Sequence, residues 1–280
     1  MVRYPISGGQ YHWVALLAPR GQAKFLSWLT GWVSTLGWQA AASTGTYLGG
    51  IIIQSLLVLN DPTYEPTRWQ GTLLLFAVLA ITLFVNTVLF KLLPGFELVI
   101  MFLHVAGLFL IMIPLVALAP ISSNAFVWTE FTNYSGYSSS GLSFLIGQSA
   151  SAVLFIGYDG ACHMAEEVQN AAINVPRAMF FTIFINGALG FAAYVFMLYC
   201  FGDPNEILKF TYGLPFIEIF YVAVKSKAGA TAMISLLVAM YIFATFAFLA
   251  SASRQAWAFS RDGGLPAYSL FRKVHSLLAH

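Results

Sequence analysis

The chain has 280 residues, of which 59% are hydrophobic and only 9% are charged. A water-soluble domain of this length needs a more highly charged surface, so the composition excludes an ordinary soluble globular protein. Thirteen basic and eleven acidic residues give a net charge of +2, which argues against a nucleic-acid partner and against a disordered acidic tail. The partner that the composition indicates is the lipid bilayer.

Long intervals without a charged residue predict membrane-spanning helices. A charge at the centre of a bilayer costs about 2.5 to 3.5 kcal/mol on insertion scales, and a helix needs about 20 residues to cross the hydrocarbon. Barrel strands would alternate in polarity, whereas these intervals are continuously apolar. We therefore expect an all-α polytopic bundle with six spans, in the intervals Phe25 to Asn60, Gly71 to Phe90, Leu98 to Thr129, Phe131 to Tyr158, Ala178 to Gly202 and Ala228 to Ser253.

These intervals predict one transmembrane domain over residues 1–280, and both ends of the chain look truncated. Residues 1–23 are expected to hold the end of a preceding span and a cytoplasmic loop, residues 24–259 the six spans, and residues 260–280 another cytoplasmic loop. Basic residues are retained on the cytoplasmic side, and nine of them fall on the side of the two chain ends against four opposite. Both ends are therefore expected to be cytoplasmic.

The run from Phe155 to Glu167 is the most informative for function, because two glycines flank a carboxylate there. Gly157 and Gly160 each weaken a helix by about 1 kcal/mol relative to alanine, so a span can unwind there and present backbone groups to a substrate. Such an interruption, with Asp159 beside it, requires surrounding protein or a water-filled cavity. The alternative is an ordinary span with Asp159 at its polar end.

Two further polar residues lie inside the apolar intervals. Gln39, in the first interval, can hydrogen-bond either a ligand or a neighbouring helix. His104 lies well inside the third interval, where a histidine can take up and release a proton or remain neutral and bond another helix. Both functional and structural roles are therefore open for each.

His163 shares a helix face with Glu166 and Glu167, but one histidine with one or two carboxylates does not make a metal site. A polar network of these residues with Arg177 at the cytoplasmic end is the expectation. The sequence has no nucleophile elbow and no phosphate-binding loop, so neither an enzyme nor a cofactor is expected. A membrane-embedded enzyme that uses His163 or Glu166 is kept as a rival interpretation.

Four stretches, taken together, carry a family resemblance: Tyr4 to Trp13, Leu29 to Trp32, Gly157 to Glu167 with its continuation to Ala178, and Ala252 to Arg254 with Arg261 to Pro266. In order and spacing they resemble the amino acid-polyamine-organocation transporters, and specifically the fungal amino acid, GABA and choline permeases. The resemblance covers essentially the whole chain. It implies a carrier with inverted repeats, of which this chain would run from late in span two to just beyond span eight.

In that family the substrate lies at mid-membrane between interrupted parts of spans one and six. The resemblance places the span-six interruption here, where backbone carbonyls would meet a cationic nitrogen, whereas the glycine motif of span one is absent from this sequence. It also supports proton coupling at His104. Because Glu166, Glu167 and Arg177 cluster at the predicted inner end, we expect them to form a cytoplasmic gate. The expected substrate-binding residues are Phe155, Ile156, Gly157, Tyr158, Asp159, Gly160 and Gln39.

The expected function is secondary active transport of amino acids or related amines such as GABA and choline, by alternating access and with a proton as the candidate coupling ion. The expected partners are the small-molecule substrate and the bilayer. The expected location is the plasma membrane, with a vacuolar or other internal membrane as the alternative. A rival interpretation is a truncated membrane fragment that is regulatory or nonfunctional.

Overall fold

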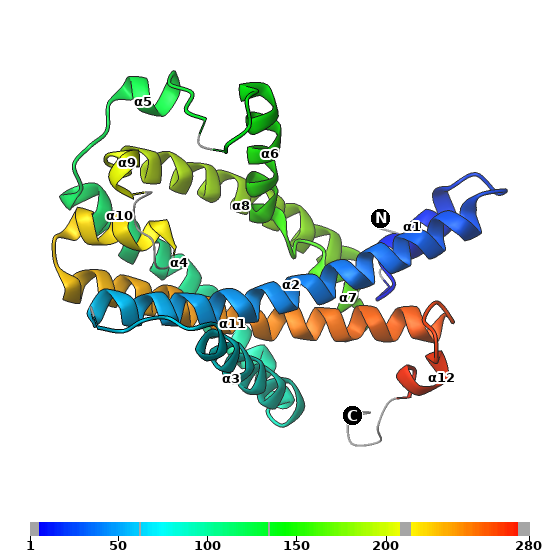
Figure 1. The fold of residues 1–280 in the computed structure, drawn as a ribbon. Helices are drawn as coiled ribbons and strands as arrows, with labels where there is room; N and C mark the ends of the chain where they lie inside the picture. Colours follow the sequence, from blue (N-terminus) through cyan, green and yellow to red (C-terminus); the bar gives the residue numbers. More distant parts are fainter. Residues whose placement is uncertain (1–5, 62, 134, 208–213, 274–280) are drawn as a thin grey trace. The chain divides into compact units, whose positions relative to one another are not determined.

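The computed structural model describes residues 6–61, 63–133, 135–207 and 214–273 (Figure 1). Every regular element within these ranges is a helix, which confirms the expected all-α class. Expectations for Tyr4, Pro5 and residues 274–280 concern the part of the chain outside these ranges. The chain forms two compact units, which we describe separately: the first unit comprises Met1–Thr44, Ile156–Phe184 and Thr245–His280, and the second comprises Gly45–Phe155 and Ile185–Ala244.

Among the described residues, five helices are long and apolar enough to cross a membrane. Each contains most or all of one predicted interval, because continuous apolar sequence favours a helix that satisfies its own backbone in lipid. The five are α2 (Ala23–Asn60), α3 (Arg68–Thr87), α4 (Leu93–Leu118) with the preceding 3₁₀ turn η1 (Phe90–Leu92), α8 (Ala171–Tyr199) and α11 (Lys227–Arg261).

The sixth predicted interval, Phe131 to Tyr158, forms a shorter helical segment, so the expected count of six spans is not confirmed. It contains α6 (Ser140–Ala152, 13 residues) and the 3₁₀ turn η2 (Val153–Phe155, 3 residues), which together are shorter than the roughly 20 residues that cross the hydrocarbon. The segment begins where the Ser139 hydroxyl accepts a hydrogen bond from the backbone N–H of Leu142. It ends just before Gly157, whose φ of 90° is incompatible with a continuing helix.

One apolar helix was not expected from the charge-free intervals. It is α10 (Pro215–Val224), which begins with a proline in its first turn and ends at Lys225 in a left-handed conformation. Glu218 lies within α10 and explains why counting charge-free residues missed it. The remaining short helices are α1 (Gln10–Leu17), α5 (Asn124–Trp128), α7 (Gly160–His163), η3 (Ala165–Glu167), α9 (Pro204–Ile207) and α12 (Tyr268–Phe271).

In the first unit, the N-terminal part of α2 runs antiparallel to the C-terminal part of α11. Trp32 packs against Phe259 with ring centroids 5.9 Å apart, and Trp38 packs against Phe248 at 6.1 Å. The residue numbers rise along one helix as they fall along the other, which defines the antiparallel direction. A small apolar core joins α1, the α7–η3 segment and the start of α8 through Trp13, Cys162, Ala165, Val175 and Met179.

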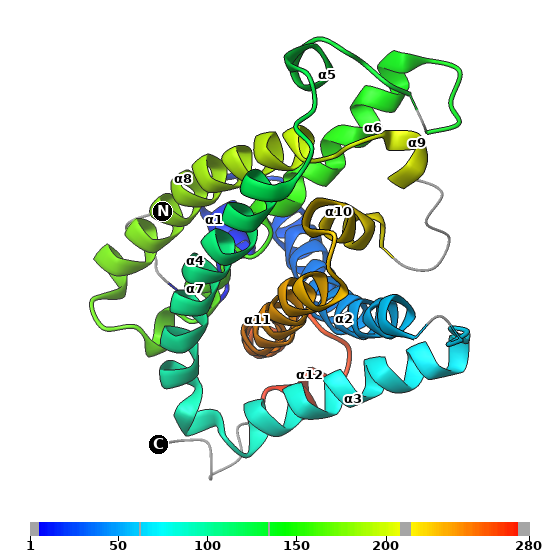
Figure 2. The same cartoon turned by 90° about the vertical axis from the view of Figure 1, so that its left-hand side faces the viewer.

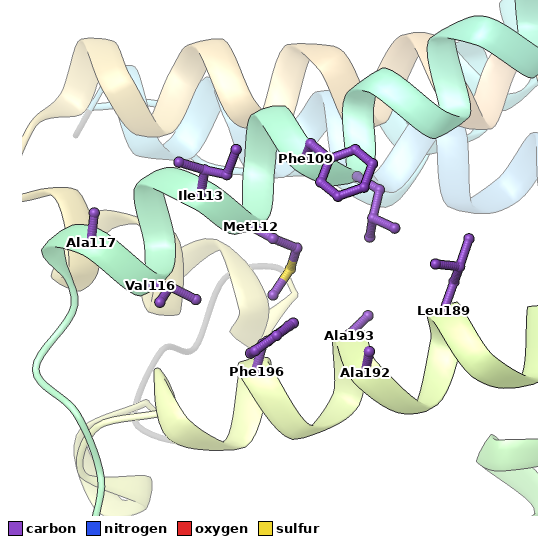
Figure 3. Close-up of a pocket in the computed structure, with 10 residues that line it drawn as sticks. Phe109, Met112, Ile113, Val116, Ala117, Leu189, Ala192, Ala193 and Phe196 are labelled. Atoms are coloured by element: carbon purple, nitrogen blue, oxygen red, sulfur yellow. The ribbon is translucent and has the colours of Figure 1, made fainter.

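The second unit has a larger apolar core, formed where α10 packs against α2, α4 and α11 (Figure 2). Its fully buried members include Leu115, Ile217, Ala230 and Ile234. A cavity of about 480 Å³ lies between α4 and α8, between the side chains of Met112 and Phe196 among others (Figure 3). Its lining side chains are all apolar, so this cavity offers no group that would recognise a charged substrate.

Candidate functional site

Helical structure stops after Phe155 and resumes at Gly160, which leaves a short irregular segment. The carbonyl of Gly157 accepts a hydrogen bond from the N–H of Gly160 at 2.9 Å, which closes a tight turn. The carbonyls of Ile156 and Tyr158 accept no hydrogen bond from other residues in the described ranges. The chain is therefore interrupted at the two glycines for which the sequence predicted a weak helix, and it carries bare carbonyl groups there.

The Asp159 carboxylate, at the end of this interruption, is the centre of a polar cluster from three elements of the first unit. Its Oδ2 atom accepts hydrogen bonds from Nε2 of Gln10 on α1 and from Nε1 of Trp38 on α2, the latter at 3.3 Å. The same Oδ2 lies 3.3 Å from Nε2 of His163 on α7. We call Gln10, Trp38, Asp159 and His163 the carboxylate cluster.

His163 is held rigidly within the carboxylate cluster. Its side chain has no exposed surface, and its ring stands edge-on against the indole of Trp38 at 5.4 Å between centroids. On the other side of the ring, Nδ1 lies 3.0 Å from the carbonyl of Ser7. The backbone near Ser7 comes close to this segment because residue 9 is a glycine. Gly9 has a φ of 54°, and an added Cβ atom there would come 2.8 Å from the sulfur of Cys162.

A second polar group, one helical turn further along, consists of two ion pairs. Glu166 accepts a hydrogen bond from the Ser7 hydroxyl at 2.6 Å and one from Arg261 at 3.0 Å. Glu167 pairs with Arg254 through both carboxylate oxygens, in the two-point geometry that arginine favours. We call Glu166, Glu167, Arg254 and Arg261 the ion-pair network.

The protonation of Glu166 follows from these contacts. Partial burial opposes ionisation, but hydrogen bonds from Ser7 and Arg261 outweigh that effect, so the pKa of Glu166 lies below its usual value. Glu166 lies outside the five candidate spanning helices. It is therefore ionised at neutral pH and able to hold Arg261.

Arg177, the expected partner of Glu166 and Glu167, lies on α8 and does not belong to the ion-pair network. It is exposed in the first turns of α8, and it makes no ion pair within the part of the chain that the structure describes. Arg254 and Arg261 of α11 occupy the role expected for it. Sequence reasoning missed them because they lie 87 and 95 residues from their glutamate partners, so no local spacing links them.

Gln39 is also placed differently from the expectation. It is exposed on α2, whereas its neighbour Trp38 is buried and reaches Asp159. Adjacent residues of an α-helix point about 100° apart, so only one of the two can face the cluster. The sequence feature that could have predicted this contact is the indole N–H of Trp38. It is a hydrogen-bond donor in an apolar helix, and it needs a partner when it is buried.

The other expected substrate-binding residues lie on either side of the interruption. Ile156 is half exposed, whereas Phe155 and Tyr158 are partly buried. Gly160 is buried, and an added Cβ atom would come 3.1 Å from the hydroxyl of Ser251 on α11. A side chain at Gly160 would therefore crowd the packing of the first unit.

His104 lies on α4 in the second unit and is partly buried. Its Nδ1 atom is 2.8 Å from the carbonyl of Ile100, one turn earlier on the same helix. Within the described ranges it has no carboxylate partner. Its geometry is that of a histidine bonded to its own helix, and its expected role in proton coupling stays a prediction.

Comparison with known proteins identifies the family to which the chain belongs. The amino acid permease family model matches residues 1–278. The chain belongs to the amino acid permease family. This permease is 29% identical to a putative amino acid/polyamine transporter of Macrophomina phaseolina, over 98% of this chain and 61% of that protein. No solved structure matches it.

Two more members of the family are similar to this chain. An uncharacterized amino-acid permease of Schizosaccharomyces pombe is 32% identical over 94% of this chain and 48% of its own length. A choline transporter of Saccharomyces cerevisiae is 27% identical over 97% of this chain and 48% of its own length. The chain therefore spans about half the length of these two relatives.

The family assignment and the five apolar helices make this permease an integral membrane protein, as expected. Its matched relatives are transporters rather than enzymes, which disfavours the membrane-embedded enzyme that the sequence left as a rival. The carboxylate cluster and the ion-pair network thus belong to a protein of a transport family.

Proposed function

We propose that this permease carries amino acids or related amines across a membrane by alternating access around the interruption between Phe155 and Gly160. The observation that carries the proposal is the Asp159 carboxylate, held at a helix interruption beside bare backbone carbonyls in an otherwise apolar chain. Polar backbone and a carboxylate at this position are costly in lipid and are retained for a ligand.

The chemistry of the interruption suits a cationic nitrogen. Amino acids, polyamines and choline, the compounds in the names of its relatives, all contain one. The carbonyls of Ile156 and Tyr158 attract such a group, and the buried Oε1 atom of Gln10 has no hydrogen-bond donor in the described part of the chain. We place the substrate against residues 155–160 with Gln10 alongside, and we leave the exposed Gln39 out of this site.

The ion-pair network is the proposed cytoplasmic gate. Its charged groups are partly exposed, with 40% of the Arg261 and 42% of the Glu166 side chain accessible to solvent. Exposed ion pairs contribute at most about 1 kcal/mol each, so they can break and re-form during a transport cycle. Arg177, which makes no ion pair with any of the described residues, is retained as a candidate for another state of the gate.

A proton is the proposed coupling ion. Two of the described histidines are candidates to carry it: His104 on α4 and His163 in the carboxylate cluster. The proposed location is the plasma membrane, and localisation of a tagged chain tests it against an internal membrane.

The second candidate function is a membrane fragment with a regulatory role or none. Counterflow into liposomes that contain the purified chain distinguishes the two. Labelled amino acids, GABA, choline and polyamines form the panel. Exchange of at least one compound supports transport, and its absence for the whole panel, with the chain correctly inserted, supports the fragment.

Variants of the same chain test the site. Asp159→Asn keeps the shape of the side chain but removes its charge, and we expect it to lower exchange by at least tenfold. Asp61→Asn, which changes an exposed carboxylate in the loop after α2, is the matched control and should exchange normally. Normal exchange by Asp159→Asn would remove the basis for a cation site at the interruption.

A further inference from the structure

The hydrogen bonds of His163 define how many protons its ring carries. Its Nδ1 atom lies 3.0 Å from the carbonyl of Ser7, and a carbonyl only accepts hydrogen bonds, so Nδ1 carries a proton. Its Nε2 atom lies 3.3 Å from Oδ2 of Asp159. If both Nε2 and the carboxylate lacked a proton, two lone pairs would face each other in a buried site.

The other contacts of Asp159 decide where the second proton lies. Oδ2 already accepts from the amide of Gln10 and from the indole of Trp38, and an indole N–H can only donate. Hydrogen bonds donated to a carboxylate favour its ionised form. The arrangement that satisfies every contact is therefore an aspartate facing a doubly protonated His163.

We propose that Asp159 and His163 bind one proton between them in this conformation, and that this is the proton coupled to substrate movement. The inference rests on the proposed function and names the residues that carry its coupling ion. Release is a simple proton transfer, in which the Nε2–H bond of His163 breaks and the proton passes to water, leaving a neutral imidazole. No electron is transferred.

The fold provides a means of release at the interruption. Gly157 lies two residues before Asp159 in the irregular segment, and rotation of the backbone there moves the carboxylate away from His163. Once separated, His163 loses the negative charge that stabilises its second proton. A change in the interruption during alternating access thereby couples to the loss of a proton.

The other charged and titratable groups near Asp159 and His163 either lie on the same segment or interact with other residues. On its own segment are Tyr158 and Cys162, whose sulfur is 4.0 Å from Nδ1 of His163. On α11, Arg254 and Arg261 are engaged by Glu167 and Glu166 respectively. On α1, Tyr11 donates to Asp262.

On α2 the contact is the uncharged Trp38, and Gln10 is the uncharged contact from α1. Among the described residues, His163 is the basic side chain that lies within ion-pair distance of Asp159, with Nε2 3.3 Å from Oδ2. His104 differs in kind, because its recorded partner is a carbonyl of its own helix and no carboxylate shares its proton.

Nuclear magnetic resonance of the chain in liposomes, labelled with ¹⁵N in histidine, tests proton binding directly. The signals of His163 are assigned by their loss in His163→Gln, with His12→Gln as the control that retains them. We expect both ring nitrogens of His163 to be protonated at neutral pH, and one of them to lose its proton in Asp159→Asn. A neutral His163 with a bare Nε2 in the unaltered chain would overturn the proposal.

Transport of a substrate found by counterflow then tests coupling. With one proton per substrate, a gradient of one pH unit supports about tenfold accumulation. We expect uptake by His163→Gln to become independent of the pH gradient, because glutamine can still donate to Asp159 but cannot titrate. Loss of accumulation in His104→Gln, with retention in His163→Gln, would place the proton at His104 and overturn the inference.

The two experiments separate failure of this inference from failure of the proposed function. If no compound is exchanged, the proposed function and the coupling role both fail, whereas resonance still decides whether the pair binds a proton. If exchange occurs and His163 is neutral, transport stands and the inference fails.

Discussion

Replacing Gly157 with alanine tests the interruption on which the site depends. Gly157 has a φ of 90°, a region that a residue with a Cβ atom enters at a cost of about 1 to 3 kcal/mol. The added Cβ atom would also lie 3.3 Å from the ring of Phe248, which is tighter than an ordinary contact. We therefore expect Gly157→Ala to destabilise the first unit by about 1 to 3 kcal/mol, a shift of about fivefold to 150-fold in its local opening equilibrium.

The matched control is Gly37→Ala on α2 of the same unit. Gly37 is helical and exposed, and an added Cβ atom there would have no other atom within 4 Å. This substitution should stabilise the helix by about 0.5 to 1 kcal/mol, so the two alanines are expected to act in opposite directions. Hydrogen exchange of the backbone amides around each position in liposomes measures both changes.

The result that refutes the reasoning is a Gly157→Ala chain whose amides exchange as slowly as those of the unaltered chain, or more slowly. Alanine would then fit at position 157 without strain, which is the behaviour expected of a continuous helix. The bare carbonyls and the placement of Asp159 would lose their structural basis.

Three further predictions concern the polar groups of the first unit. The charge reversal Arg254→Glu should open the gate, which increased labelling of a cysteine introduced on its cytoplasmic side would measure. Adding Glu167→Arg to this variant should restore protection of the cysteine. If protection does not return, the two side chains do not act as a pair. Because the folded-state pKa of Glu166 is lowered, its contribution to stability is present above its unfolded pKa of about 4.5 and is lost as the pH falls through the lower folded value. Thermal unfolding of Glu166→Gln should therefore depend less on pH in that range than unfolding of the unaltered chain, and an equal dependence would contradict the assigned shift. Trp38→Phe removes a donor from a buried carboxylate and should cost about 1 to 3 kcal/mol in unfolding free energy, whereas Trp32→Phe, whose indole N–H has no partner in the described ranges, should cost less; equal losses would count against the hydrogen bond.

The proposed site divides recognition between two kinds of group. Backbone carbonyls at the interruption and the amide oxygen of Gln10 accept from any cationic nitrogen, so they favour a class of substrate rather than one compound. The Asp159–His163 pair, by contrast, balances its own charge through a shared proton. In the proposed site, the class of substrate therefore depends on these acceptors, and coupling depends on the Asp159–His163 pair.

The sequence by itself determined the helical class and most of the spanning elements. Apolar intervals specify helices locally, since each helix satisfies its own backbone and needs no partner to do so. The weak point at Gly157 and Gly160 was also local, because a glycine lowers helix stability wherever it stands. The same local reasoning failed for α10, where Glu218 interrupts the apolar run although the helix forms around it.

Only the tertiary structure decided which side chains meet. Asp159 was identified from its neighbours in sequence, but its partners Gln10 and Trp38 lie 149 and 121 residues away, and the Ser7 carbonyl lies 156 residues from His163. Arg177 was favoured for the gate because it is near in sequence. The choice of partners depends on how α1, α2 and α11 pack around the interrupted segment, and that packing sums many weak contacts which no local pattern records.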